Sequence, residues 1–140
     1  MNIIEYANEL GLMILTHAGV DIGLPEPVHC PPDRMRKVID IIKPKKLIVA
    51  HMGGWSQWEQ VCEYLVGEDI YFDTAFCMDY ISQEMFCKIW EKHDKDKILF
   101  ATDSPWGEAG KTIKQLKEMP LSREEIEDIL ANNAKKLLGF

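Results

Sequence analysis

The chain contains three short apolar runs, and each ends on a side chain that can bind a metal or move a proton. They span residues 12–17, 47–51 and 98–103 and end on His17, His51 and Asp103. Because helical patterns separate them, such runs are typical of parallel strands buried on both faces. Functional groups of such sheets lie at the carboxyl ends of the strands. We therefore expect the two imidazoles and the carboxylate to meet at one sheet edge, where they could hold a divalent metal.

Amphipathic helical patterns fill the intervals between these runs, and a fourth strand is expected at residues 69–76. Ser82 is expected to cap a helix, and two other serines have a glutamate three residues later, the spacing of a capping box. The expected helices with both ends defined are residues 2–10, 33–42, 110–118 and 122–138. Two more are expected to begin near Ser56 and after Ser82. The capping-box pairs are Ser56 with Glu59 and Ser122 with Glu125. Four strands alternating with helices indicate consecutive right-handed βαβ units, in a barrel or a doubly wound sheet.

Length and composition narrow the function classes. With 140 residues the chain can form one domain with a substantial core. It carries 23 acidic and 16 basic residues, a net charge of -7, and no basic stripe, which argues against a nucleic-acid partner. No apolar stretch reaches the roughly 18–20 residues of a membrane span, and the start at Met1 lacks a signal-sequence pattern. We expect a soluble, cytoplasmic protein with no membrane partner and with reduced cysteines, since no CxxC spacing occurs.

Five segments, in a fixed order, carry a family resemblance. They are Thr16-His17-Ala18-Gly19, Ala50-His51-Met52-Gly53-Gly54, Tyr71-Phe72-Asp73-Thr74, Ala101-Thr102-Asp103-Ser104-Pro105-Trp106 and Asn133-Ala134-Lys135-Lys136-Leu137-Leu138-Gly139. Each segment alone is weak evidence, but the ordered set closely resembles the amidohydrolase superfamily of metal-dependent hydrolases, over essentially the whole chain. The resemblance is strongest to the branch that contains aminocarboxymuconate semialdehyde decarboxylase.

This resemblance implies a (β/α)8 TIM barrel with a divalent metal at the carboxyl ends of its strands, usually zinc, with manganese or iron as alternatives. The matched segments then correspond to strands five to eight, and His17, His51 and Asp103 take the metal-site positions of the fifth, sixth and eighth strands. Family members also carry a His-x-His pair on the first strand, and no such pair occurs in these 140 residues. Since a complete barrel needs about 250 residues, we expect residues 1–140 to form a single half-barrel domain. It resembles the C-terminal part of a longer enzyme, or a protein that begins late.

Asp103 and His51 are the candidate catalytic residues. A bound metal would lower the pKa of its water towards neutrality, and Asp103 could accept the proton and deliver it to the leaving group. By the resemblance, His51 would lie beside this water as an acid, a base or an electrophilic helper. The alternative is a strand-end histidine that bonds a backbone carbonyl. His17 is interpreted as a metal ligand, with loop capping as its alternative.

Several aromatic residues lie near the expected strand ends. Trp55, Phe76 and Trp106 could wall a pocket for a planar or aromatic acid, whereas the helical position of Trp58 favours core packing. Asp73 lies inside a strand, and we favour a structural hydrogen-bonding role for it.

The remaining candidates receive plain structural interpretations. His29 and Cys30 lie in a proline-rich loop and could reach the mouth of the site, but we favour ordinary loop residues. His93, at a helix end, is expected to be a solvated cap without chemistry.

The leading hypothesis is a metal-dependent hydrolase that acts on a small carbonyl or carboxylate compound through metal-activated water. Non-oxidative decarboxylation by the same residue types is one alternative. A second is an inactive half-barrel that self-associates as a homo-oligomer, because four strands leave two open sheet edges. A third is a degraded site that binds metal through the same three residues without turnover.

Overall fold

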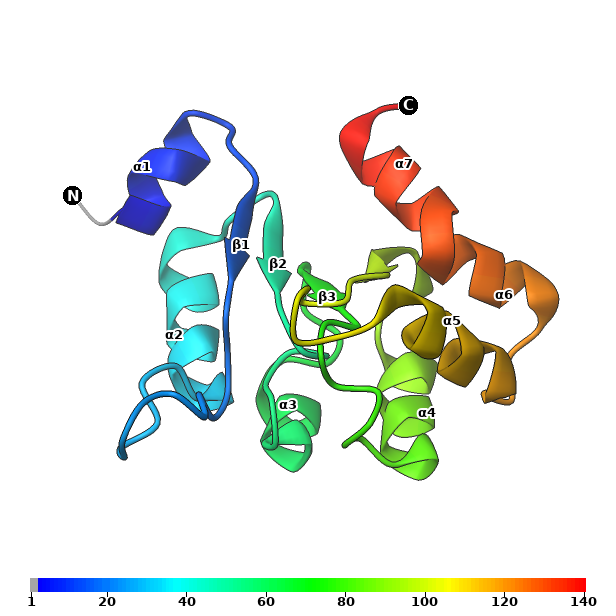
Figure 1. Cartoon of the computed structure of the whole chain (residues 1–140). Coiled ribbons are helices and arrows are strands. Elements are labelled where there is room, and N and C mark those ends of the chain that lie inside the picture. The colour runs from blue at the N-terminus through cyan, green and yellow to red at the C-terminus, as the bar shows by residue number, and fades with distance from the viewer. Residues whose placement is uncertain (1–2) are drawn as a thin grey trace.

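The computed structural model describes residues 3–140 and contains a four-stranded parallel sheet (Figure 1). The strands are β1 (Ile14–Thr16), β2 (Leu47–Val49), β3 (Tyr71–Asp73) and β4 (Ile98–Leu99), and they lie side by side in chain order. All three pairings are parallel. The expected α/β fold, a partial TIM barrel of four βα units, is confirmed.

Helix α1 precedes the first strand and a helix follows each strand, close to where the sequence places them. They are α1 (Ile3–Glu9), α2 (Pro32–Ile42), α3 (Trp58–Tyr64), α4 (Gln83–Lys92), the 3-10 turn η1 (Lys95–Lys97), α5 (Ala109–Glu118), α6 (Arg123–Glu127), the π-helical turn η2 (Asp128–Asn132) and α7 (Asn133–Leu138). Figure 1 places α1 and α7 towards opposite ends of the sheet. There α1 contacts β1, and α7 contacts β4.

Side-chain caps begin two of these helices as expected. The Ser82 hydroxyl accepts the Met85 N–H at 3.1 Å, and Ser122 forms a full capping box with Glu125. The capping box expected at Ser56 is wrong. The backbone of Ser56 is left-handed, with φ 60°, because this serine belongs to the turn after β2. Helix α3 begins after Gln57 without a side-chain cap.

Alternate residues of the strands face opposite sides of the sheet, because the strand period is two. Val49, Phe72 and Ile98 are paired neighbours in one row, and they belong to the core that also contains Met35 of α2 and Phe86 of α4. The alternate residues, such as Leu15 of β1 and Asp73 of β3, point to the other side of the sheet. This second side carries the pocket described below.

The expectation that every strand is buried on both faces holds for β2 and is wrong for β1. All three residues of β2 are buried, but the Leu15 side chain of β1 is 65% exposed. The cause is position: β1 is an edge of the sheet, and in residues 3–140 nothing covers its pocket side.

His93 is buried, so the expectation of a solvated cap is wrong. It does follow the last residue of α4, but it is only 4% exposed and its ring stacks on Phe72 with centroids 4.2 Å apart. Its Nδ1 accepts the Gly67 N–H at 3.1 Å, and its Nε2 donates to the Ile70 carbonyl at 3.0 Å. Burial lowers the pKa of His93, so the neutral ring is the form that this network holds.

Candidate active site

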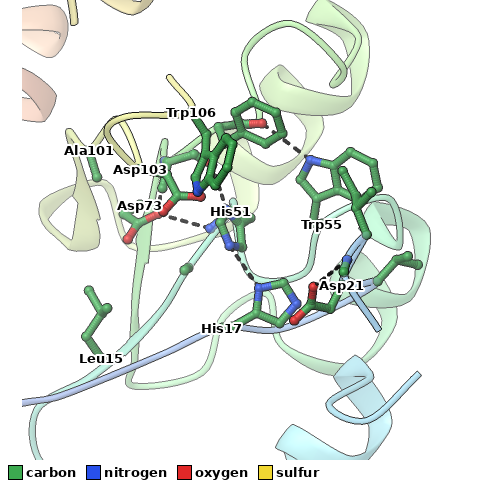
Figure 2. Close-up of a pocket in the computed structure, with 15 residues that line it drawn as sticks. Leu15, His17, Asp21, His51, Trp55, Asp73, Ala101, Asp103 and Trp106 are labelled. Carbon is green, nitrogen blue, oxygen red and sulfur yellow. Dashed lines mark hydrogen bonds between the residues drawn. The ribbon is translucent and has the colours of Figure 1, made fainter. Parts of the chain in front are cut away.

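A pocket of about 670 Å³ lies at the carboxyl ends of the strands. His17, His51 and Asp103 all line it, and Asp73 joins them. Figure 2 shows His51 between His17 on one side and the carboxylates of Asp73 and Asp103 on the other. The structure therefore brings the three residues selected from the sequence to one cavity.

Two of these residues have strained backbone conformations. His51 has φ 61° and Asp103 has φ 60°, in the left-handed region that non-glycine residues seldom occupy. Such residues persist only where the surroundings hold them, and they concentrate at functional sites. At His51 the holding contacts are clear: the Trp58 indole N–H donates to the His51 carbonyl at 3.0 Å, and the next residue, Met52, donates its N–H to the Asp73 carbonyl.

The His51 ring is fixed at both nitrogens. Nδ1 lies 2.7 Å from the Ala75 carbonyl oxygen, and Nε2 lies 3.0 Å from Nδ1 of His17. A carbonyl oxygen can only accept, so Nδ1 must carry the proton, and in the neutral ring Nε2 presents a lone pair. The hydrogen-bond partners thus assign the tautomer of His51.

The same logic assigns the tautomer of His17. Since Nε2 of His51 accepts, Nδ1 of His17 donates, and the neutral His17 ring keeps a bare lone pair on Nε2. This Nε2 is buried and has no hydrogen-bond partner within residues 3–140. A buried acceptor without a partner is costly, and it is the atom that a metal ion or a donor group would satisfy.

Asp73 is a buried carboxylate, 2% exposed, that binds backbone on both sides of the pocket floor. One oxygen, Oδ1, accepts the N–H of His51 and the N–H of Ala75, each at 3.0 Å. Burial raises the pKa of Asp73; these two hydrogen bonds oppose the rise, and the nearby charge of Asp103 adds to it. The structural role favoured from the sequence agrees with these contacts, and the carboxylate also lines the pocket.

The donor types suit a divalent metal, but the set is incomplete. A neutral imidazole with an oriented second nitrogen, as at His17, and an exposed carboxylate, as at Asp103, are common ligands. In the described part of the chain, however, no three His, Cys, Asp or Glu side chains converge closely enough to hold a metal ion. The ligand assignment of His17, His51 and Asp103 therefore stays a prediction.

Aromatic side chains form one wall of the pocket. Trp55, Phe76 and Trp106 line it, as the sequence suggested, and Trp58 is packed against the core instead. Tyr80 was missed: its ring lies edge-on to Trp55 and tilted to Phe76, with centroids 5.3 Å apart in both pairs. No local pattern singles out this tyrosine, because the contact arises from the turn after β3.

The pocket floor could have been found from spacing alone. Leu15 and Ala101 line the pocket, and each stands two residues before a candidate side chain, His17 or Asp103. His29 and Cys30 behave as ordinary loop residues, as favoured from the sequence, since neither lines the pocket that the described residues form.

A comparison with protein families gives the decisive observation: residues 1–140 match the family described as Amidohydrolase. The chain belongs to the amidohydrolase family. This family is metal-dependent, and the structural neighbours of the chain include proteins described as decarboxylases and hydrolases. No helix within residues 3–140 is long and apolar enough to cross a membrane.

Solved structures of low sequence identity share the fold. An uncharacterized TIM-barrel protein from Bordetella bronchiseptica superposes with a TM-score of 0.75 at 15% identity, over 97% of this chain and 48% of its own. 5-Carboxyvanillate decarboxylase from Sphingomonas paucimobilis gives 0.66 at 12%, over 99% and 52%. Dihydroxybenzoic acid decarboxylase from Polaromonas sp. JS666, with bound manganese and the inhibitor 2-nitroresorcinol, gives 0.65 at 15%, over 96% and 52%.

The chain spans about half the length of these solved structures. A comparison with curated protein sequences gives no match.

Proposed function

We propose that this chain carries part of a metal-dependent amidohydrolase site that acts on a small carbonyl or carboxylate compound. The observation that supports it best is the lone pair of His17 Nε2, buried without a partner in the wall of a pocket that also exposes Asp103. A protein interior rarely leaves such an atom unsatisfied. An electrophile, either a metal ion or a donor on a substrate, is what this atom lacks.

In this proposal His17 and Asp103 are metal ligands, and His51 is a further ligand or a catalytic helper beside the metal. When bound, a divalent metal would act as a Lewis acid and lower the pKa of a coordinated water. Zinc is the proposed metal, with manganese or iron as alternatives. The His-x-His pair of the family does not occur in this sequence, so a full shell would need ligands from outside these 140 residues.

The protein residues themselves would hold and move the proton. Ala75 keeps the Nδ1 proton of His51 in place, so Nε2, which accepts Nδ1–H of His17, is the nitrogen that would take up a proton and return it. Asp103 is exposed to the pocket and can accept a proton from water and deliver it to a leaving group or to a carbon that loses carboxylate. Hydrolysis and non-oxidative decarboxylation both need these steps, and we propose hydrolysis first and decarboxylation as the alternative.

The aromatic lining of the pocket supports a planar, aromatic carboxylic acid as substrate. Trp55 and Phe76 are braced by Tyr80, and such fixed rings favour stacked or edge-on contact with another ring. Two of the structural neighbours are decarboxylases of aromatic acids. The proposed setting is cytoplasmic.

Metal content tests the proposal directly. The protein would be purified without chelator and analysed for zinc, manganese and iron, beside His17→Ala and Asp103→Ala. His29→Ala is the matched control, since it removes an exposed histidine outside the pocket. We expect near-stoichiometric metal in the wild type and in the control, and loss in both pocket variants. A metal-free wild type that takes up no added zinc or manganese would refute an active metal site in this chain.

Turnover would be tested separately. Ester, amide and lactone probes report hydrolysis, and carbon dioxide release from dihydroxybenzoates reports decarboxylation. Metal retained through His17 and Asp103 with no turnover of either kind would favour a binding site without catalysis.

We also propose a single half-barrel domain over residues 1–140 that self-associates, because one observation favours it. The Leu15 side chain on edge strand β1 is 65% exposed, and Leu12 and Met13 before it are exposed as well. A second copy placed against β1 would cover this edge strand and its apolar face, whereas the backbone at β4 already bonds Ile129 and Asn133. Sedimentation velocity over a hundredfold concentration range tests this, and a monomer at every concentration would refute it.

A further inference from the structure

One carboxylate oxygen connects the two sides of the pocket floor. Oδ1 of Asp73 accepts the N–H of His51, at the end of β2, and the N–H of Ala75, two residues after Asp73 itself. Ala75 in turn supplies the carbonyl that receives Nδ1–H of His51. Asp73 therefore holds both the backbone of His51 and the residue that orients its ring.

The hydrogen bonds of the two rings all run in one sense, from the Nδ1–H of each histidine to its acceptor. The proton on Nδ1 of His51 points to Ala75, the lone pair on Nε2 accepts Nδ1–H of His17, and the lone pair of His17 Nε2 is left without a partner. Moving Ala75 or the His51 backbone would free His51 to turn or to exchange tautomer. His17 would then lose the acceptor that fixes its own proton.

The conformations around Asp73 need such support. His51 and Met52 are consecutive left-handed residues, with φ 61° and 52°, and neither is a glycine. A non-glycine residue in this conformation is strained, because its Cβ approaches the following carbonyl oxygen. The N–H groups of both residues bind Asp73, one at its side chain and one at its carbonyl. Asp73 is thus the common anchor of the strained turn.

We propose that Asp73 is a positioning residue that sets the tautomers of His51 and His17, so that Nε2 of His17 stays unprotonated in the pocket. It acts through Ala75 and the His51 backbone, without forming part of the hydrogen bond between the two rings. Its meaning for catalysis rests on the proposed function. The tautomers themselves are measured without metal or substrate, so a failure here is distinct from an absence of metal or of turnover.

Nitrogen-15 NMR of the imidazole rings tests the proposal. The chain has only four histidines, and single His→Gln variants assign their ring signals. At a pH where the rings are neutral, we expect protonated Nδ1 and bare Nε2 for both His51 and His17 in the wild type. His93 provides an internal contrast, because its partners place the proton on Nε2. A wild type with the proton of His51 on Nε2 would overturn the proposal, and this result requires no variant to fold.

Substitutions at Asp73 provide the second arm. Asp73→Asn keeps an oxygen that can accept both N–H groups, so it should retain the wild-type ring signals of His51 and His17. Asp73→Ala and Asp73→Leu remove the acceptor and should shift the Nδ1 signal of His51 towards the unprotonated range, with His17 following. Asn133→Ala is the control, because it removes a buried side chain that bonds the Lys95 and Ile98 carbonyls. Unchanged tautomers in folded Asp73→Ala or Asp73→Leu, or the same shift in Asn133→Ala, would refute a positioning role.

Discussion

Replacing Gly19 with alanine should damage the fold next to the pocket more than its small size suggests. Gly19 follows the His17 strand end and has φ 90°. A Cβ there would lie 2.3 Å from the Trp55 nitrogen and 2.4 Å from the Trp55 oxygen, both backbone atoms that cannot turn away. Two hydrogen bonds cross this contact: Trp55 donates its N–H to the Ala18 carbonyl at 2.8 Å, and Val20 donates its own to the Trp55 carbonyl at 3.0 Å.

The cost can be worked out from these parts. A non-glycine residue in the left-handed region costs roughly 1–2 kcal/mol. Separating the two segments weakens the two crossing hydrogen bonds, each worth about 0.5–1.5 kcal/mol. Gly19→Ala should therefore lower the free energy of unfolding by about 2–5 kcal/mol.

Gly11→Ala isolates the conformational part of this cost. Gly11 also has a positive φ, 69°, but a Cβ there would meet nothing within 4 Å. We expect it to lose only about 1–2 kcal/mol. Urea unfolding of both variants and the wild type measures the difference. Equal losses in the two variants would show that the contact with Trp55 carries no energy and would refute the reasoning.

Three further predictions concern a buried histidine, the pocket wall and a helix cap. Because burial lowers the pKa of His93, the unfolded chain binds this proton at higher pH than the folded chain, so stability should fall as the pH drops below about 6.5. His93→Gln should flatten that slope in thermal unfolding from pH 8 to 5, and an unchanged slope would contradict the assignment. Trp106 is 75% exposed, so Trp106→Ala should change the free energy of unfolding by less than about 0.5 kcal/mol. The same substitution should weaken the binding of a dihydroxybenzoate in calorimetric titration. Equal affinity of the variant and the wild type would exclude Trp106 as a wall of the site. Ser122→Ala removes the acceptor of a capping box and should cost about 1 kcal/mol in urea unfolding, and no loss would mean that α6 does not need its cap.

The parallel direction of the strands could be predicted from the sequence because buried parallel strands leave a strong local signal, but this pattern left a barrel and a doubly wound sheet open, and only the family resemblance selected the barrel. The apolar runs end on His17, His51 and Asp103 because the carboxyl ends of the strands line the pocket. Sequential βα units then admit few arrangements, and the observed order β1-β2-β3-β4 is the simplest of them. The meeting of the three side chains in one pocket follows from that topology.

The details that depend on tertiary contact could not be predicted. His93 has the sequence position of a helix cap, but the loop at Gly67 and the ring of Phe72 close over it. Ser56 has the spacing of a capping box, yet the turn that follows His51 takes it into a left-handed conformation. At His93 partners distant in sequence override the local preference, and at Ser56 the conformation of the turn after β2 does.

The alternation along the strands also separates residues that pack the core from residues that line the pocket. In β3, Phe72 belongs to the core beneath the helices, while the adjacent Asp73 serves the pocket. Of these two neighbouring residues, Phe72 thus fills space in the core and Asp73 provides a polar group in the pocket. Substitutions of Phe72 and its row act on the packing against the helices, and substitutions at Leu15 or Asp73 act on the pocket. The pocket residues of such a sheet, and with them the reaction, can change while the packing of the sheet against its helices is kept.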